Sequence, residues 1–104
     1  MSKNALELMK SRYSAYAAGE IDYIIKTTHP KSPLFEENII EWKKSIREFS
    51  KSNFKKLEIL DFFEKENEAF VEFRAYIDDF VLHEKSRFKK EKNWLYYDGE
   101  FLSS

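Results

Sequence analysis

The sequence predicts an α+β fold, with about three N-terminal helices packed on a curved four-stranded antiparallel sheet. Two observations lead to this prediction. Up to about residue 50, apolar residues recur at steps of three and four, which is the period of an amphipathic helix. From Phe54 onward they alternate with polar residues, which is the period of a strand. Helices followed by an unbroken run of strands favour an antiparallel meander with the helices on one face. A strongly bent sheet of this kind would enclose an internal pocket.

The first helix is expected from Lys3 to Ala18, with Ser2 as its N-cap. Gly19 is the natural stop, because glycine adopts the left-handed cap conformation at little cost. The inward face of this helix carries one charged residue, Arg12, at its centre. The residues of that face are Ala5, Leu8, Met9, Arg12, Tyr13, Tyr16 and Ala17.

Two further helices are expected before the sheet. The second runs over residues 20–28 and ends before Pro30, because proline disfavours helical geometry in the residue that precedes it. The third runs over residues 36–50, with acidic residues in its first turn, where they suit the helix dipole. Trp42 lies on the apolar side of this third helix, so we expect its ring to point into the core.

The alternating part of the chain predicts four strands. They are residues 56–65, 68–78, 80–90 and 94–98. The second strand has the clearest pattern, with one apolar face made of Ala69, Val71, Phe73, Ala75 and Ile77. In the first strand the register is ambiguous, because Asp61 shares a face with Ile59 while Leu60 and Phe62 share the other. A β-bulge could reconcile the two patterns. An exposed Asp61 is the simpler interpretation.

Composition excludes several classes of protein. The 104 residues fit one domain, 1–104, and 42% hydrophobic content argues against disorder. The net charge of −1 argues against a nucleic-acid-binding protein, which is usually basic.

The absence of cysteine excludes disulfides, cysteine zinc sites and thiol catalysis. The two histidines do not make a metal site by themselves. With no apolar run long enough for a signal or a membrane span, we expect a cytoplasmic domain without membrane contact or cofactor.

Glu84 is the most unusual residue of the sheet. It shares the apolar face of the third strand with Phe80, Leu82, Ser86 and Phe88. A buried carboxylate is costly unless it has a partner. Because Arg12 is the charge on the inward face of the first helix, we expect a bidentate Arg12–Glu84 pair. The pair could simply fix how the helix docks on the sheet, or it could form the floor of a ligand pocket. The residues alone favour the architectural role.

Two blocks of sequence carry a family resemblance. SRYSAYAAGEIDYIIKTTHP spans residues 11–30, and LHEKSRF, residues 82–88, is followed by NWLYYDG, residues 93–99. Together they resemble the central domain of the YchJ-like proteins, a bacterial family with a fold similar to nuclear transport factor 2, the NTF2-like superfamily. The resemblance covers nearly the whole chain and implies an NTF2-like cone.

The resemblance implies no particular reaction. Longer family members carry cysteine-rich segments with a zinc-binding SEC-C motif, and this sequence has none of them, so no zinc-dependent or adaptor role is carried over. The superfamily includes isomerases and dehydratases as well as non-catalytic binding domains. A function inferred from the fold alone would be analogy.

The candidate site residues are those expected to line the internal pocket. They combine the Arg12–Glu84 pair, a neighbouring serine, and aromatic side chains, among which buried tyrosine hydroxyls need partners. The full set is Arg12, Tyr13, Tyr16, Trp42, Phe73, Glu84, Ser86, Phe88 and Trp94. No catalytic residue is assigned, since no histidine is placed beside Ser86 to activate it.

Three functions from different classes follow from this site. The leading hypothesis is a non-catalytic domain that binds a small molecule or a partner in its pocket. The second is an isomerase- or dehydratase-like enzyme with Glu84 or Asp61 as general base. The third is a homodimerisation module that uses the outer sheet face around His83. A carboxylate open to the cavity and unpaired would favour the enzyme, whereas Glu84 locked to Arg12 would favour a binding or structural domain.

Overall fold

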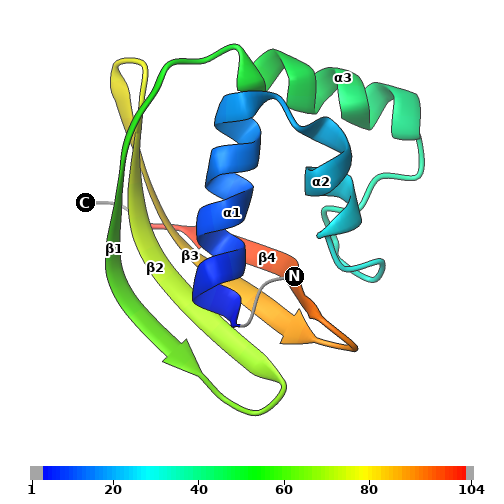
Figure 1. Cartoon of the computed structure of the whole chain (residues 1–104), viewed down its shortest axis with the longest axis vertical. Helices are drawn as coiled ribbons and strands as arrows, with labels where there is room; N and C mark the ends of the chain where they lie inside the picture. Colours follow the sequence, from blue (N-terminus) through cyan, green and yellow to red (C-terminus); the bar gives the residue numbers. More distant parts are fainter. Residues whose placement is uncertain (1–3, 103–104) are drawn as a thin grey trace.

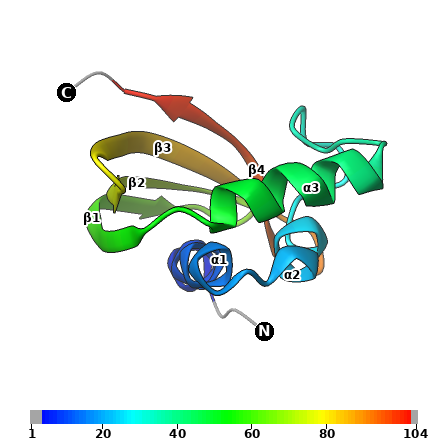
Figure 2. The same ribbon diagram turned by 90° about the horizontal axis from the view of Figure 1, so that it is seen from above.

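The computed structural model describes residues 4–102 and confirms the α+β fold, with three helices on a four-stranded antiparallel sheet. The helices are α1 (Ala5–Ala18), α2 (Ile21–Lys26) and α3 (Ile39–Ser50). The strands are β1 (Phe54–Glu64), β2 (Glu68–Ile77), β3 (Phe80–Lys90) and β4 (Trp94–Phe101), and they pair in the order β1-β2-β3-β4. Figure 1 shows the helices on one face of the sheet, which curves around α1. Figure 2, from above, shows α1 nearly end-on, with α2 to one side of it.

The ends of α1 are set by two capping residues. Asn4 is the N-cap, because its side-chain oxygen accepts a hydrogen bond of 2.8 Å from the backbone N–H of Glu7. The predicted cap, Ser2, lies outside the described residues. At the other end, Gly19 has a φ of 73°, which confirms the predicted left-handed stop. Within the helix Ala15 is buried and Ala17 is exposed, which corrects the predicted inward face at its last position.

The other two helices are shorter than predicted. Helix α2 ends at Lys26, because Thr28 already pairs with Tyr96 of β4 in an isolated bridge. Helix α3 begins after Asn38, whose side chain accepts a hydrogen bond of 3.1 Å from the N–H of Glu41. The predicted start at residue 36 was therefore wrong, since a capping side chain outweighs a favourable acidic position in choosing where a helix begins.

A β-bulge resolves the ambiguous register of β1. The pairing with β2 shifts between Ile59 and Asp61, so Leu60 is the extra residue. After the shift, Phe62 packs against the core. Asp61 is exposed and accepts a hydrogen bond of 2.9 Å from the N–H of Phe62. The simpler interpretation of Asp61 is therefore confirmed.

A bulge also shapes β4. Arg87 pairs with Asp98, but its neighbour Phe88 pairs with Tyr96, so Tyr97 has no partner in β3. The extra residue lets both Tyr96 and Gly99 lie on the inner face although they are three positions apart. β4 continues to Phe101 rather than ending at residue 98, and the predicted strand was too short.

The core lies between the helices and the inner face of the sheet, in two clusters. The larger cluster joins α1 to the sheet and includes the predicted buried face of β2. Its buried members are Ala5, Leu8, Met9, Ala69, Val71, Phe73, Ala75, Ile77, Phe88 and Trp94. The smaller cluster joins the helices through Ala15, Ile24, Trp42 and Ile46. The ring of Trp42 lies 4.9 Å from that of Phe35, which confirms that it points inward. Each such large side chain contributes about 1.5–3 kcal/mol through burial.

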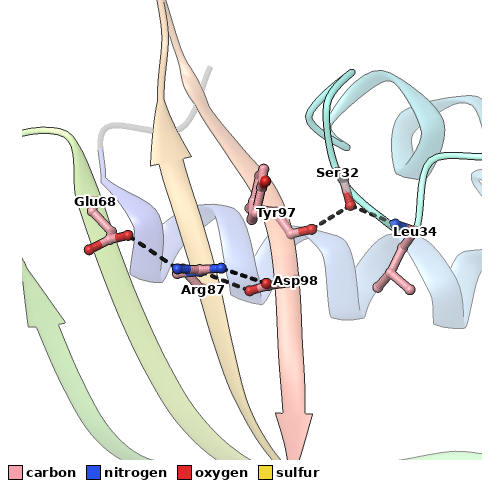
Figure 3. Close-up of polar contacts among 6 residues, drawn as sticks. All are labelled: Ser32, Leu34, Glu68, Arg87, Tyr97 and Asp98. Carbon is pink, nitrogen blue, oxygen red and sulfur yellow. Dashed lines mark hydrogen bonds and ion pairs between the residues drawn. The ribbon is translucent and has the colours of Figure 1, made fainter.

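The outer face of the sheet carries a charge network that Figure 3 shows around Arg87. Arg87 donates to both carboxylate oxygens of Asp98, at 2.9 and 2.7 Å, and lies 3.6 Å from a carboxylate oxygen of Glu68. This network joins the strands β2, β3 and β4 on the side away from the helices.

The connection between α2 and α3 is tied to β4 by Ser32. The Ser32 hydroxyl donates to the backbone carbonyl of Tyr97 and accepts from the N–H of Leu34 at 3.0 Å (Figure 3). His29 also ties this connection to β4, because its backbone N–H donates to the carbonyl of Tyr96 at 2.8 Å. Across residues 4–102, the structure contains no helix with the length and apolar character needed to span a membrane.

Candidate functional site

A cavity of about 350 Å³ lies between the helices and the inner face of the sheet. Most of its wall is apolar, with aromatic side chains such as Phe49, Phe54, Phe73 and Phe88. Three lining residues are also markedly exposed, Leu34 at 52%, Phe80 at 47% and Phe101 at 73%, and they mark its opening to solvent. The polar lining residues are Arg12, Tyr13, Tyr16, Thr28, Glu84, Ser86 and Tyr96.

Arg12 is held by the C-terminal end of α2. Its Nη1 atom donates to the carbonyl of Ile24 at 3.0 Å, to the hydroxyl of Thr27 at 2.7 Å and to that of Thr28 at 3.3 Å. A cation is favourable at this position, because the carbonyls at the end of a helix carry partial negative charge. Arg12 is only 8% exposed, so these contacts replace most of its hydration.

Tyr96 lies between Arg12 and Glu84. The Arg12 Cζ atom is 4.6 Å from the centre of the Tyr96 ring, which is a cation–π distance. The hydroxyl of the same tyrosine donates to Oε2 of Glu84 at 3.3 Å. Among the described residues, Arg12 and Glu84 form no ion pair. The predicted bidentate pair was therefore wrong: helix α2 and an aromatic face satisfy the guanidinium instead.

The Glu84 carboxylate is held at one oxygen. Oε2 accepts from the hydroxyl of Ser86 at 2.6 Å and from that of Tyr96. Within the described part of the chain, no hydrogen bond ends on Oε1. The carboxylate lies against Gly99, where a Cβ atom would come within 2.0 Å of Oε2. Gly99 is opposite Ser86 in the register, so a glycine on the edge strand makes room for the acid.

The buried position shifts the pKa values of this cluster. Burial raises the pKa of Glu84 and outweighs the hydrogen bonds from Ser86 and Tyr96 and the charge of Arg12, which all lower it. Burial also raises the pKa of Tyr96, and the nearby Glu84 carboxylate adds to this. Arg12 keeps its proton although burial lowers its pKa. The cavity therefore holds a permanent cation beside a carboxyl group that resists ionisation.

All but one of the predicted site residues line this cavity. Those that do are Arg12, Tyr13, Tyr16, Trp42, Phe73, Glu84, Ser86 and Phe88. Trp94 does not: it is 5% exposed and belongs to the larger core cluster with Ala5 and Leu8. Whether the lining residues bind a ligand stays a prediction.

Sequence reasoning missed three features of the site. Tyr96 was detectable, because it lies two residues after Trp94 and so shares its strand face. Thr27 and Thr28 carried no signal, since nothing in a sequence shows that a helix end will meet an arginine of another helix. Gly99 was recognised only as part of a family motif, and its role depends on the bulge in β4.

The remaining candidates lie outside the cavity. Asp61 is exposed on β1 and does not line the cavity, so it is not placed to act as a general base there. His83 is on the outer face of the sheet, with Nε2 at 2.8 Å from a carboxylate oxygen of Glu72. The Nε2 atom of His29 lies 3.0 Å from a carboxylate oxygen of Glu91. The described residues contain no group of three or more histidine and acidic side chains that could hold a metal ion.

Comparison with known proteins shows which family this chain resembles. Residues 4–99 match the model of the YchJ middle NTF2-like domain. A UPF0225 protein of Vibrio parahaemolyticus is 41% identical over 106 residues, which cover 95% of this chain and 60% of the relative. A UPF0225 protein of Vibrio vulnificus is 39% identical over 102 residues, which cover 91% of this chain and 58% of the relative. The chain thus spans less than two thirds of the length of these relatives.

Two solved structures have a similar fold. The solution structure of a SEC-C motif containing protein from Rhodopseudomonas palustris has a TM-score of 0.80 and 33% identity, and the match covers 93% of this chain and 77% of that one. The crystal structure of a SEC-C motif containing protein from Psychrobacter arcticus has a TM-score of 0.75 and 28% identity, with 98% and 63% covered. This chain has no cysteine. Its sequence and its fold agree: the chain belongs to the YchJ family and corresponds to the middle NTF2-like domain.

Proposed function

We propose that this domain binds a small, mainly apolar molecule in its cavity, without transforming it. The observation that carries the proposal is the cavity itself. Its volume of about 350 Å³ falls in the range of small-molecule sites. An apolar wall with a few converging polar groups is also the usual composition of such sites.

The expected sign of a binding domain, Glu84 locked to Arg12, is absent, but other neighbours anchor both polar groups, and this anchoring supports binding over catalysis. Arg12 is anchored to the end of α2, and Glu84 is anchored to Ser86 and Tyr96. Groups held in this way can orient a ligand. The second carboxylate that an acid–base pair would need, Asp61, lies outside the cavity.

A second candidate function rests on one observation. Glu84 is 8% exposed, lines the cavity and has an oxygen without a hydrogen bond among the described residues, as a general acid or base of an isomerase or dehydratase would. The two proposals differ in the fate of the ligand. A binding domain returns every ligand unchanged, which mass spectrometry of the recovered ligand would show, whereas an enzyme would convert it.

The binding proposal can be tested with a neutral aromatic probe, 4-bromobenzyl alcohol. Trp42 lines the cavity, so a bound bromine atom would quench its fluorescence. In heteronuclear NMR spectra, the same titration should shift resonances of cavity residues such as Trp42 and Phe88. Resonances of the outer face, such as those of Arg87, should stay in place. Shifts confined to the outer face, or none at saturating probe, would reject the cavity as a binding site.

A cavity-filling variant provides the matched control. Ala75 is fully buried in β2 and lines the cavity, so Ala75→Leu places three additional carbon atoms inside it. The variant should fold, as judged by circular dichroism, and should lose quenching by the probe. The NMR mapping on the unchanged chain remains decisive if overpacking prevents the variant from folding.

The homodimer predicted for the outer sheet face remains a prediction. Several aromatic rings on that face are covered by cations of the same chain: Lys85 lies 5.3 Å from the ring of Phe70, and Lys89 lies 3.9 Å from that of Tyr97. Sedimentation at two concentrations would test the prediction, and a monomer at both would reject it.

A further inference from the structure

The cavity contains a buried cation, Arg12, that forms no ion pair with a carboxylate of the described residues. The three hydrogen bonds of Arg12 to α2 all leave from Nη1 and end on neutral oxygens. The Nε and Nη2 donors take no part in these bonds, and the Tyr16 hydroxyl is a further uncharged partner of the guanidinium. The face of the guanidinium rests on the ring of Tyr96, at 4.6 Å. A buried charge without an opposite charge is unfavourable, so this position favours an anionic group from outside the chain.

Glu84 offers a second contact at the same end of the cavity. It is 8% exposed, and its Oε1 atom is free of hydrogen bonds among the described residues, while Oε2 is engaged by Ser86 and Tyr96. The titratable groups that surround it are Arg12 and Tyr16 from α1 and Tyr96 from β4. From α2, Tyr23 lies near Arg12, and β2 places the apolar Phe73 opposite Glu84. None of these neighbours is a second acid.

We infer that the ligand of this cavity is a small apolar monocarboxylate, bound by Arg12 through its charge and by Glu84 through its Oε1 atom. The inference rests on the proposed binding function and names the class of ligand. The single cation matches a single negative charge, and the phenylalanine-rich wall matches an apolar body. A neutral Glu84 donates a hydrogen bond from Oε1 to the ligand carboxylate, which an ionised Glu84 would repel.

Other charges on the ligand fit less well. An amine would lie beside the permanent charge of Arg12 and would need an ionised Glu84, which burial disfavours. A neutral amide would leave the charge of Arg12 without an opposite charge, as in the free domain. A dicarboxylate would bring a second negative charge into an apolar space with no second cation among the lining residues.

The first experiment compares three probes with the same phenylbutyl body, measured by calorimetry on the whole chain. They are 4-phenylbutyrate, its neutral amide and 4-phenylbutylamine. The carboxylate should bind at least about tenfold more tightly than the amide, and the amine should bind most weakly. Equal affinities would uphold the proposed function and overturn the monocarboxylate inference, as would tightest binding of the amine. Absence of binding by all three would overturn both.

The second experiment tests the protonation of Glu84. The affinity for 4-phenylbutyrate should fall at least about tenfold between roughly pH 6 and pH 9, because a proton must stay on Glu84 in the complex. In Glu84→Gln, which keeps a neutral donor at this position, the affinity should change by less than about twofold over the same range. A flat profile in the unchanged chain, or the same fall in both proteins, would overturn the role of Glu84.

Discussion

Glu84 lies so close over Gly99 that a Cβ atom on the glycine would come within 2.0 Å of the Oε2 atom. The carboxylate and a side chain at position 99 therefore exclude each other. Gly99→Ala should destabilise the domain by about 1–3 kcal/mol, because the carboxylate must leave its bonds with Ser86 and Tyr96. Urea unfolding would measure this change.

A double-mutant cycle separates this effect from a general preference for glycine. In the Glu84→Ala background, Gly99→Ala should cost at least about 1 kcal/mol less than in the unchanged chain, since the clashing group is gone. An equal cost in both backgrounds would show that the contact with Glu84 is not the reason for the glycine.

The stability of the domain should depend on pH through Glu84. Burial holds the pKa of Glu84 above its ordinary value, so the native state binds this proton more tightly than the unfolded chain does. The free energy of unfolding should therefore fall as the pH rises from the ordinary pKa toward the raised one. The contribution is fully present below the ordinary pKa and is lost above the raised one.

Glu84→Gln isolates this contribution, because glutamine stays neutral. Relative to the unchanged chain, this variant should become more stable as the pH is raised from about 4 to about 8. Asp61→Asn, which removes an exposed carboxylate, is the matched control and should show little change. If the advantage of Glu84→Gln shrinks with pH, the attraction of Arg12 outweighs burial and the direction of the pKa shift is reversed.

The hydroxyl of Ser86 affects the pKa of the same carboxylate, Glu84. Its hydrogen bond of 2.6 Å to Oε2 lowers the pKa of Glu84, so Ser86→Ala should raise that pKa further. The variant should also lose roughly 0.5–1.5 kcal/mol of stability at neutral pH. Carbon-detected NMR titration of the Glu84 carboxyl group would measure the shift. An unchanged or lower pKa in the variant would contradict the role of this bond.

The anchoring of Arg12 to α2 should matter more than a surface ion pair. Arg12→Met removes three hydrogen bonds and the cation–π contact while keeping an unbranched side chain, and should cost roughly 1–3 kcal/mol. Arg87→Met on the outer face, where Arg87 is 35% exposed, should cost less than about 1 kcal/mol and depend on salt. Thermal and urea unfolding of the two variants side by side would test this order, and the reverse order would refute it.

Much of the fold could be predicted from local patterns. The change of period near Phe54 separates the helices from the sheet, because the spacing of buried residues follows directly from helical and strand geometry. Gly19 marked the end of α1, and the strict alternation of β2 marked its buried face. The same alternation placed Glu84 and Ser86 on the inner face of β3, where the structure has them.

The partners of these residues could not be predicted in this way. A pattern shows that Arg12 faces inward but not which oxygen atoms meet it, and the nearest charge in the predicted core was Glu84. In the structure Arg12 donates its hydrogen bonds to oxygen atoms at the end of α2. Tyr96 occupies the space between Arg12 and Glu84. That position of Tyr96 relative to Gly99 depends on a bulge in β4 that alternation alone does not reveal.

Local sequence patterns were enough to predict the class of fold, the order of its elements and the inward position of two ionisable residues, Arg12 and Glu84. These properties follow from local periodicity and from the cost of burying charge. Three-dimensional packing, by contrast, places the ring of Tyr96 between Arg12 and Glu84, so that the two groups contact different neighbours. The reason is that contacts across a core depend on how helices and a bulged sheet pack together in three dimensions, which no single element specifies.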